Sequence, residues 1–156
     1  MTSTASPTST AFDVPAASFS YLERSASSLR EALTSTDVGM RYAHAHVAAL
    51  RATAALLAAR ARPVSGSRRR PQRNAWVLLA EVAPEFTEWA MFFSAGAAKR
   101  AAAEAGSRRA VTEREADDLV RDADRFLGLV EESLGLTRHL PVPARLPVPP
   151  AVQRVG

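Results

Sequence analysis

The chain of 156 residues contains no cysteine and only three histidines. The missing thiols exclude structural disulfides, iron–sulfur clusters, thiolate zinc sites and cysteine nucleophiles. Three histidines are too few for a multi-histidine metal site, so we predict no metal. The sequence also shows no glycine-rich phosphate loop and no Ser–His–Asp arrangement, and we therefore predict no cofactor.

A long hydrophobic run is also missing. The most apolar stretch, residues 43–61, is mostly alanine and contains two histidines and two arginines, so it is a poor membrane span. The N-terminus lacks a basic segment followed by an apolar run, which argues against a secretory signal. We expect a cytoplasmic protein without a membrane partner.

Lysine is nearly absent, since Lys99 is the only one, and arginine carries the rest of the positive charge. One acid-free run holds five of the arginines: Arg62, Arg68, Arg69, Arg70 and Arg73. Such a run is a candidate RNA- or nucleotide-binding loop with salt-dependent affinity. Because residues 63–73 contain no aromatic side chain to stack on a base, a solubilising loop is the simpler interpretation.

Other basic residues are expected at the two ends of the folded domain. Bundle topology would bring the residues after the last helix to the arginine run: Arg138, His139 and Arg145. The opposite end would collect Lys99, Arg100, Arg108 and Arg109. These placements predict two basic poles.

Composition divides the chain into three parts. Residues 1–17 are mostly Ser, Thr, Ala and Pro, which predicts a disordered N-terminal arm. Residues 136–156 contain five prolines, which no helix tolerates, and predict an extended Pro-rich C-terminal tail. Residues 18–135 remain as one helical domain.

Four segments of this domain have apolar residues at helical spacing, and none alternates with period two. We therefore predict an all-α fold, an antiparallel four-helix bundle with a short extra helix before the third long helix. The first segment has the apolar residues Phe19, Leu22, Ala26, Leu29 and Leu33. The second runs over 36–61, and the third restarts at Pro84 after a short helix over 75–83 and ends at Gly106. The fourth ends at Gly135.

Capping signals mark several of these helices. Ser20 with Glu23 and Thr112 with Glu115 have capping-box spacing, and Asn74 can cap the short helix. The fourth helix has the clearest apolar stripe, consisting of Ala116, Leu119, Val120, Ala123, Phe126, Leu127, Val130 and Leu134. Its narrow stripe is typical of an amphipathic core helix.

Several stretches taken together are similar to a known family. They are residues 41–52, 58–63, 75–79, 82–90, 92–98 and 116–119. Over about residues 20–135 the chain resembles the SAV-type family of small actinobacterial HEPN-domain proteins. The resemblance implies an all-helical bundle that often dimerises. It also implies either a metal-independent ribonuclease, whose paired site uses an Arg and a His separated by four to six residues, or a non-catalytic binding module.

Arg41 and His46 form the one pair with this spacing. The resemblance would give His46 proton transfer at the ribose 2′-hydroxyl and Arg41 charge stabilisation at the phosphate. Both lie in one predicted helix, about 140° apart, and earlier in the chain than the family's motif. His46 lies on the apolar face near Leu50, which favours a packed histidine bonded to a carbonyl.

We therefore expect a non-catalytic HEPN-like module that acts by protein association, with RNA or nucleotide contact through the arginine run. The alternative is a toxin-type endoribonuclease that uses Arg41 and His46. A homodimer is the expected assembly, and a nucleotidyltransferase-like or antitoxin protein is a further candidate partner. Phe92 and Phe93 are adjacent, so one of the two rings is expected at a partner surface.

Overall fold

The computed structural model describes residues 13–60 and 74–143, and its elements are all helices. They are α1 (Ala16–Thr34), α2 (Val38–Arg60), α3 (Ala75–Val82), the 3₁₀ turn η1 (Pro84–Phe86), α4 (Thr87–Ala95), α5 (Ala97–Glu104) and α6 (Glu113–Ser133). No strand occurs within these two ranges. The predicted all-α class is confirmed.

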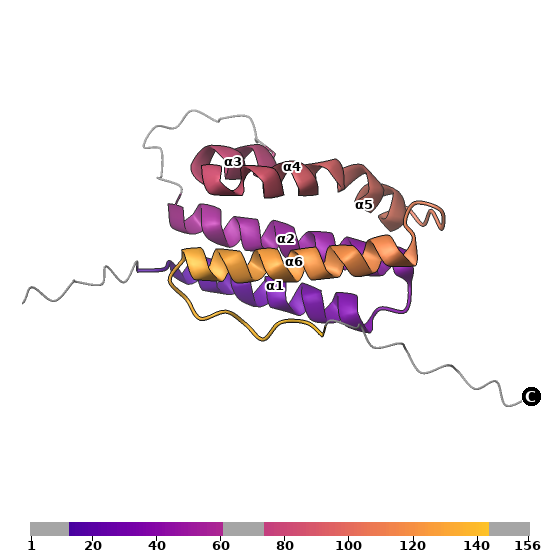
Figure 1. Cartoon of the computed structure of the whole chain (residues 1–156), viewed down its shortest axis with the longest axis horizontal. Coiled ribbons are helices and arrows are strands. Elements are labelled where there is room, and N and C mark those ends of the chain that lie inside the picture. Colours follow the sequence, from indigo (N-terminus) through magenta and orange to yellow (C-terminus); the bar gives the residue numbers. More distant parts are fainter. Residues whose placement is uncertain (1–12, 61–73, 144–156) are drawn as a thin grey trace, which may run out of the picture.

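Helix α2 is the central element of the fold. The long helices α1, α2 and α6 lie side by side, and α3, α4 and α5 form a second layer (Figure 1). α2 contacts α1, α3, α5 and α6, and no residue from 41 to 60 is fully exposed. Its many alanines permit this close approach on several sides. Burial therefore extends almost all round the helix.

The seam between α1 and α2 is polar as well as apolar. Ser18 Oγ donates to the carbonyl of Ala55 at 2.8 Å, and Ser25 Oγ donates to the carbonyl of Ala48 at 2.7 Å. Because each hydroxyl has a carbonyl acceptor, the serines are buried without an unpaired polar group. Their small size lets the two helices pack closely.

Two details predicted for α1 are wrong. Phe19 is exposed rather than buried, because the buried face is rotated onto the serines: Ser18, Leu22, Ser25, Ser28, Leu29 and Ala32. The capping box of Ser20 and Glu23 does not form, because α1 already begins at Ala16 after Pro15. The helix thus starts inside the segment 1–17 that the sequence assigned to a disordered arm.

The third long helix of the prediction is divided in the structure. Asn74 caps α3 by accepting from the Trp76 amide at 2.9 Å, and Pro84 opens η1, as predicted. The helix after Pro84 breaks at Gly96, between α4 and α5. A Cβ at Gly96 would lie 2.7 Å from the Tyr42 hydroxyl, so glycine allows the backbone to approach α2. Gly106, with φ of 89°, then ends α5.

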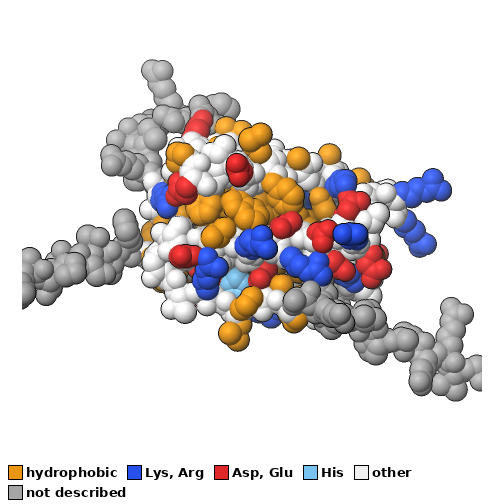
Figure 2. Space-filling model, viewed as in Figure 1, with side chains coloured by type: hydrophobic (Ala, Val, Ile, Leu, Met, Phe, Trp, Pro, Cys, Tyr) orange, Lys and Arg blue, Asp and Glu red, His pale blue; other side chains and the backbone are white. Residues whose placement is uncertain are grey.

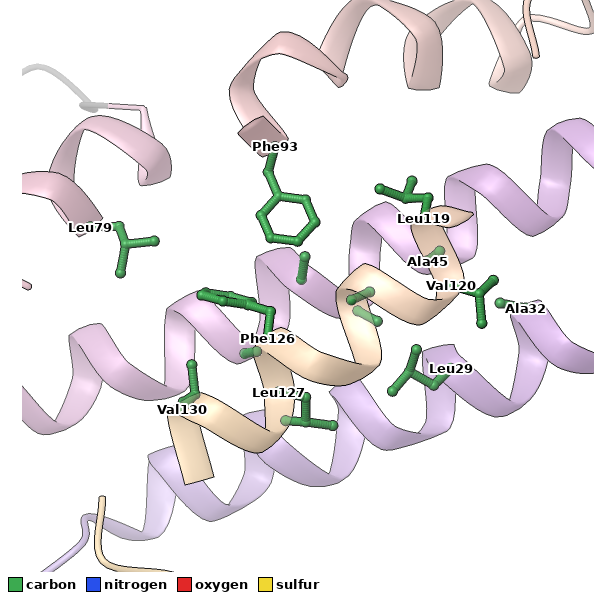
Figure 3. Packing of buried hydrophobic residues seen from close by; sticks show 14 of the residues in the cluster. Leu29, Ala32, Ala45, Leu79, Phe93, Leu119, Val120, Phe126, Leu127 and Val130 are labelled. Atoms are coloured by element: carbon green, nitrogen blue, oxygen red, sulfur yellow. The ribbon is translucent and has the colours of Figure 1, made fainter. Parts of the chain in front are cut away.

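Helix α6 behaves as its sequence pattern predicts. The Thr112 hydroxyl accepts from the Glu115 amide at 3.1 Å, and every residue of the predicted apolar stripe is buried. Phe126, Leu127 and Val130 point toward residues from α1, α2, α3 and α4 (Figure 3). Phe126 also packs against Phe93 of α4 with ring centroids 5.2 Å apart, and this contact joins α6 to the second layer, formed by α3, α4 and α5.

The chain after α6 packs on the domain. Gly135 has φ of 74° and ends the helix, and residues 136–143 then run back without helix or strand (Figure 1). Leu136 and Val142 pack against the core, and the Val142 amide donates to Asp124 Oδ2 at 3.2 Å. The beginning of the predicted tail is thus extended but docked. Across residues 13–60 and 74–143, no helix has both the length and the apolar character needed to cross a bilayer.

Candidate functional site

Arg41, one of the two candidate catalytic residues, joins three parts of the fold. Its Nη1 donates to Asp117 Oδ1 on α6 at 2.6 Å, and its Nη2 donates to the carbonyl of Ser35 at 3.2 Å. The side chain is almost entirely buried, while Asp117 is partly exposed. The guanidinium therefore ties the connection between α1 and α2 to α6.

His46, the other candidate, is buried in the aromatic part of the core. Its Nε2 donates to the carbonyl of Phe93 at 2.9 Å, as the sequence analysis favoured, and its ring lies edge-on to Trp76 at 5.6 Å. Nδ1 has no hydrogen-bond partner among the described residues. Burial is the main cause that lowers the pKa of His46, so the ring is neutral at neutral pH.

The two side chains are not brought together within one chain. Arg41 bonds to α6 and to the segment before α2, whereas His46 bonds to α4. Both therefore already have structural partners, and a catalytic role for the pair stays a prediction.

The arginine run cannot be placed in the same way. Arg62, Arg68, Arg69, Arg70 and Arg73 lie outside the described residues, as does Arg145. Their expected neighbours can be placed: Arg138 pairs with Glu132, and His139 pairs with Asp124 and Glu131 of α6.

The two-pole prediction needs correction for these paired groups. At the other end Lys99 pairs with Glu115, and Arg100 lies 3.7 Å from Glu104. Paired cations add little net charge to a surface, which reduces the contribution of these residues. Arg108 and Arg109 are exposed and make no ion pair with the described residues, so they keep their end of the domain basic.

An apolar surface covers the outer side of α3 and α4, and we call it the α3–α4 face. Met91 and Val77 are 69% and 50% exposed, and they line a groove of about 700 Å³. The rest of its lining is Trp76, Ala80, Ala90 and Ala95 with the polar residues Glu81, Thr87 and Ser94. Hydrophobic side chains are also visible on the upper layer in Figure 2. The sequence analysis missed this face, although the all-apolar run Trp76–Leu79 is a signal of a helix that is apolar on more than one side.

The adjacent phenylalanines divide as the sequence predicted. Phe93 is fully buried, and Phe92 is 47% exposed. Phe92 therefore provides an aromatic surface next to the α3–α4 face, and it borders the cleft between α4 and α6.

The helices of residues 13–60 and 74–143 define an all-α domain. A family model described as SAV_6107-like HEPN matches residues 32–131, from the end of α1 to the end of α6. This match spans more than half of the chain, and the protein belongs to the SAV_6107-like HEPN family. No curated protein and no solved structure shows a significant match to the chain.

Proposed function

We propose that this protein is a non-catalytic HEPN module that acts by protein association, with a second copy of the chain on its α3–α4 face. The observation that carries the proposal is the exposure of Met91 and Val77 beside a wide apolar groove. Exposed apolar surface of this kind is costly in water and is typical of association sites. Because the family resemblance implies dimers, a second copy of the chain is the first candidate to cover the α3–α4 face.

The same proposal includes an antiparallel four-helix organisation. In it, α4 and α5 together take the place of the third long helix, and α3 is the short helix before it. α3 runs back along α4, since Trp76 near the start of α3 stacks on Phe93 near the end of α4. Figure 1 supports the organisation, because α1, α2, the α4–α5 pair and α6 alternate in direction along the chain. A self-complementary dimer would then pair the α3–α4 faces of two copies.

The surroundings of Arg41 and His46 favour a non-catalytic role. A general base needs access to the substrate hydroxyl, and His46 is only 1% exposed, packed against Trp76 and Phe93 at the wall of the cleft between α4 and α6. Arg41 would have to leave Asp117 before it could bind a phosphate. Catalysis by this pair would therefore break contacts that stabilise the folded chain.

Light scattering coupled to size exclusion tests the association. We expect a dimer for the native chain and a monomer for Met91→Glu, because a buried carboxylate on an apolar interface is strongly unfavourable. Phe19→Glu is the matched control, since Phe19 is an exposed apolar residue on α1, away from the face. A native chain that stays monomeric at every concentration would refute the proposed association.

RNA contact through the arginine run is the second part of the proposal. The support is the acid-free sequence of Arg62, Arg68, Arg69, Arg70 and Arg73. We expect RNA to bind at low salt and to be released as salt rises, because phosphate contacts exchange with counterions. Replacing Arg68, Arg69 and Arg70 by serine should abolish the gel shift, and a shift that survives this change would move the contact elsewhere.

The competing function is a metal-independent endoribonuclease, and the spacing of Arg41 and His46 is its support. Incubation of the pure protein with mixed RNA in the presence of a chelator separates the two functions. Cleavage that disappears in both Arg41→Ala and His46→Ala, with the helical circular dichroism spectrum retained, would establish the nuclease. A native protein that leaves RNA intact supports the non-catalytic module.

A further inference from the structure

A cleft of about 370 Å³ opens between α6 and the α4–α5 pair, above α2. We call it the α4–α6 cleft. Its polar and aromatic lining consists of Tyr42, His46, Phe92, Phe93, Lys99, Glu115, Asp118 and Asp122. Figure 2 shows hydrophobic side chains gathered between the upper layer and α6, with charged side chains along the lower border. The cleft thus combines an apolar wall with carboxylates.

Tyr42 supplies a polar group that the fold itself does not use. Only 6% of the residue is exposed, and its hydroxyl has no hydrogen-bond partner among the described residues, although Lys99 and Glu115 lie near enough to act on it electrostatically. Gly96 provides the space that the hydroxyl occupies, since a Cβ there would lie 2.7 Å away. Burial is the main cause that raises the pKa of Tyr42, so the phenol keeps its proton at neutral pH. A buried phenol at the edge of a cleft is a natural contact for a polar ligand.

Three carboxylates and one ammonium group line the cleft, and Arg121 and Arg125 lie close enough to act on Asp122. Lys99 is compensated by Glu115, and Asp118 bonds to Arg121 at 3.1 Å. Asp122 is partly buried and makes no hydrogen bond or ion pair with the described residues. Burial is the main cause that raises the pKa of Asp122, while the nearby Arg125 opposes the rise. A cation beside Asp122 would stabilise its charged carboxylate and offset the effect of burial.

Phe92 gives the cleft an aromatic wall. Its ring packs edge-to-face against Phe93 at 5.1 Å and against Trp89 at 6.4 Å between centroids. These two contacts hold a ring that is nevertheless half exposed. A cation near an aromatic ring gains a further attraction, and the methylene groups of its stem gain apolar contact.

We propose that the α4–α6 cleft binds an organic cation, a guanidinium or ammonium group on a short apolar stem. Asp122 pairs with the cation, the Tyr42 oxygen accepts one of its N–H groups, and Phe92 with Leu119 packs against the stem. An arginine or lysine side chain of a polypeptide has this chemistry, and so does a free small amine. The cleft shares Ala95 with the α3–α4 groove, but none of the residues proposed to contact the cation lines that groove, so this inference stands independently of the proposed dimer.

Isothermal titration calorimetry with three probes tests the proposal. The probes are n-butylguanidinium, a capped alanine peptide with one central arginine, and the same peptide with neutral citrulline. Binding of butylguanidinium alone assigns the site to a free amine, and binding of the arginine peptide assigns it to a polypeptide. Failure of both cations to bind, or equal binding of the citrulline peptide, would overturn the proposal.

Two variants and one control connect the binding to the cleft. Asp122→Asn should weaken cation binding by about fivefold, the usual size of a partly exposed ion pair. Tyr42→Phe should weaken it by about threefold or more through loss of one hydrogen bond. Glu113→Gln makes the same charge change in the first turn of α6, outside the cleft, and should leave binding unchanged. Cation binding that drops equally in Glu113→Gln would mean a nonspecific charge effect and would reject the site.

Discussion

The contact between His139 and α6 predicts a pH-dependent stability. Its two ring nitrogens bond to Asp124 and Glu131, which hold residues 136–143 on the helix. The hydrogen bond to Asp124 is the main cause that raises the pKa of His139 from 6.5 to about 9, and Glu131 adds to it. Because the folded pKa is the higher one, the stabilisation is complete below pH 6.5 and is lost as pH rises through 9.

The size of the effect follows from the difference between the two pKa values. At about 1.4 kcal/mol per pKa unit, the rise from 6.5 to about 9 sets an upper limit of about 3–4 kcal/mol. Solvent reaches 22% of the His139 side chain and screens the pair. We therefore expect His139→Gln to lower the free energy of unfolding by about 1–2 kcal/mol below pH 6.5.

Urea denaturation of the native chain and of His139→Gln, below pH 6.5 and above pH 9, measures this difference. The two stabilities should converge at the higher pH, where the native imidazole is neutral. His44→Gln is the matched control, since His44 lies 3.2 Å from the exposed Glu31 on the protein surface. An NMR titration should place the His139 ring well above 6.5, and a pH-independent difference between the two chains would refute the reasoning.

Three further predictions concern the core. Gly96→Ala should lower the free energy of unfolding by about 1–3 kcal/mol, because the added methyl group meets the Tyr42 hydroxyl. In urea denaturation, the double variant with Tyr42→Phe should recover part of this loss. No recovery in the double variant would place the strain elsewhere. Arg41→Ala should lower the free energy of unfolding by about 2–3 kcal/mol, because the partly buried Asp117 and the backbone carbonyl of Ser35 both lose a hydrogen-bond donor. An unchanged melting temperature would contradict this. Phe126→Ala should lower the free energy of unfolding, measured by calorimetry, by about 3–5 kcal/mol, since the ring is fully buried. A loss below about 1 kcal/mol would mean that neighbouring side chains refill the cavity.

The candidate site was only partly accessible to sequence analysis. Helical spacing correctly placed His46 on the apolar side of α2, and its carbonyl partner proved to be Phe93. The spacing of Arg41 and His46 defines an angle around one helix, but not which neighbouring helices the two side chains meet. The cleft was missed for the same reason, since Tyr42 and Asp122 are 80 residues apart in sequence.

By itself, the sequence determined the helical class, the caps at Asn74 and Thr112, and the buried stripe of α6, because large apolar side chains at regular spacing leave only one face to bury. Tertiary structure decided the rest. Alanine and serine are compatible with either a buried or an exposed position, so only packing could bury α2 nearly all round and turn the serines of α1 inward. Only the return of the chain beside α6 could place His139 between two carboxylates, since that contact depends on distances in space and not along the chain.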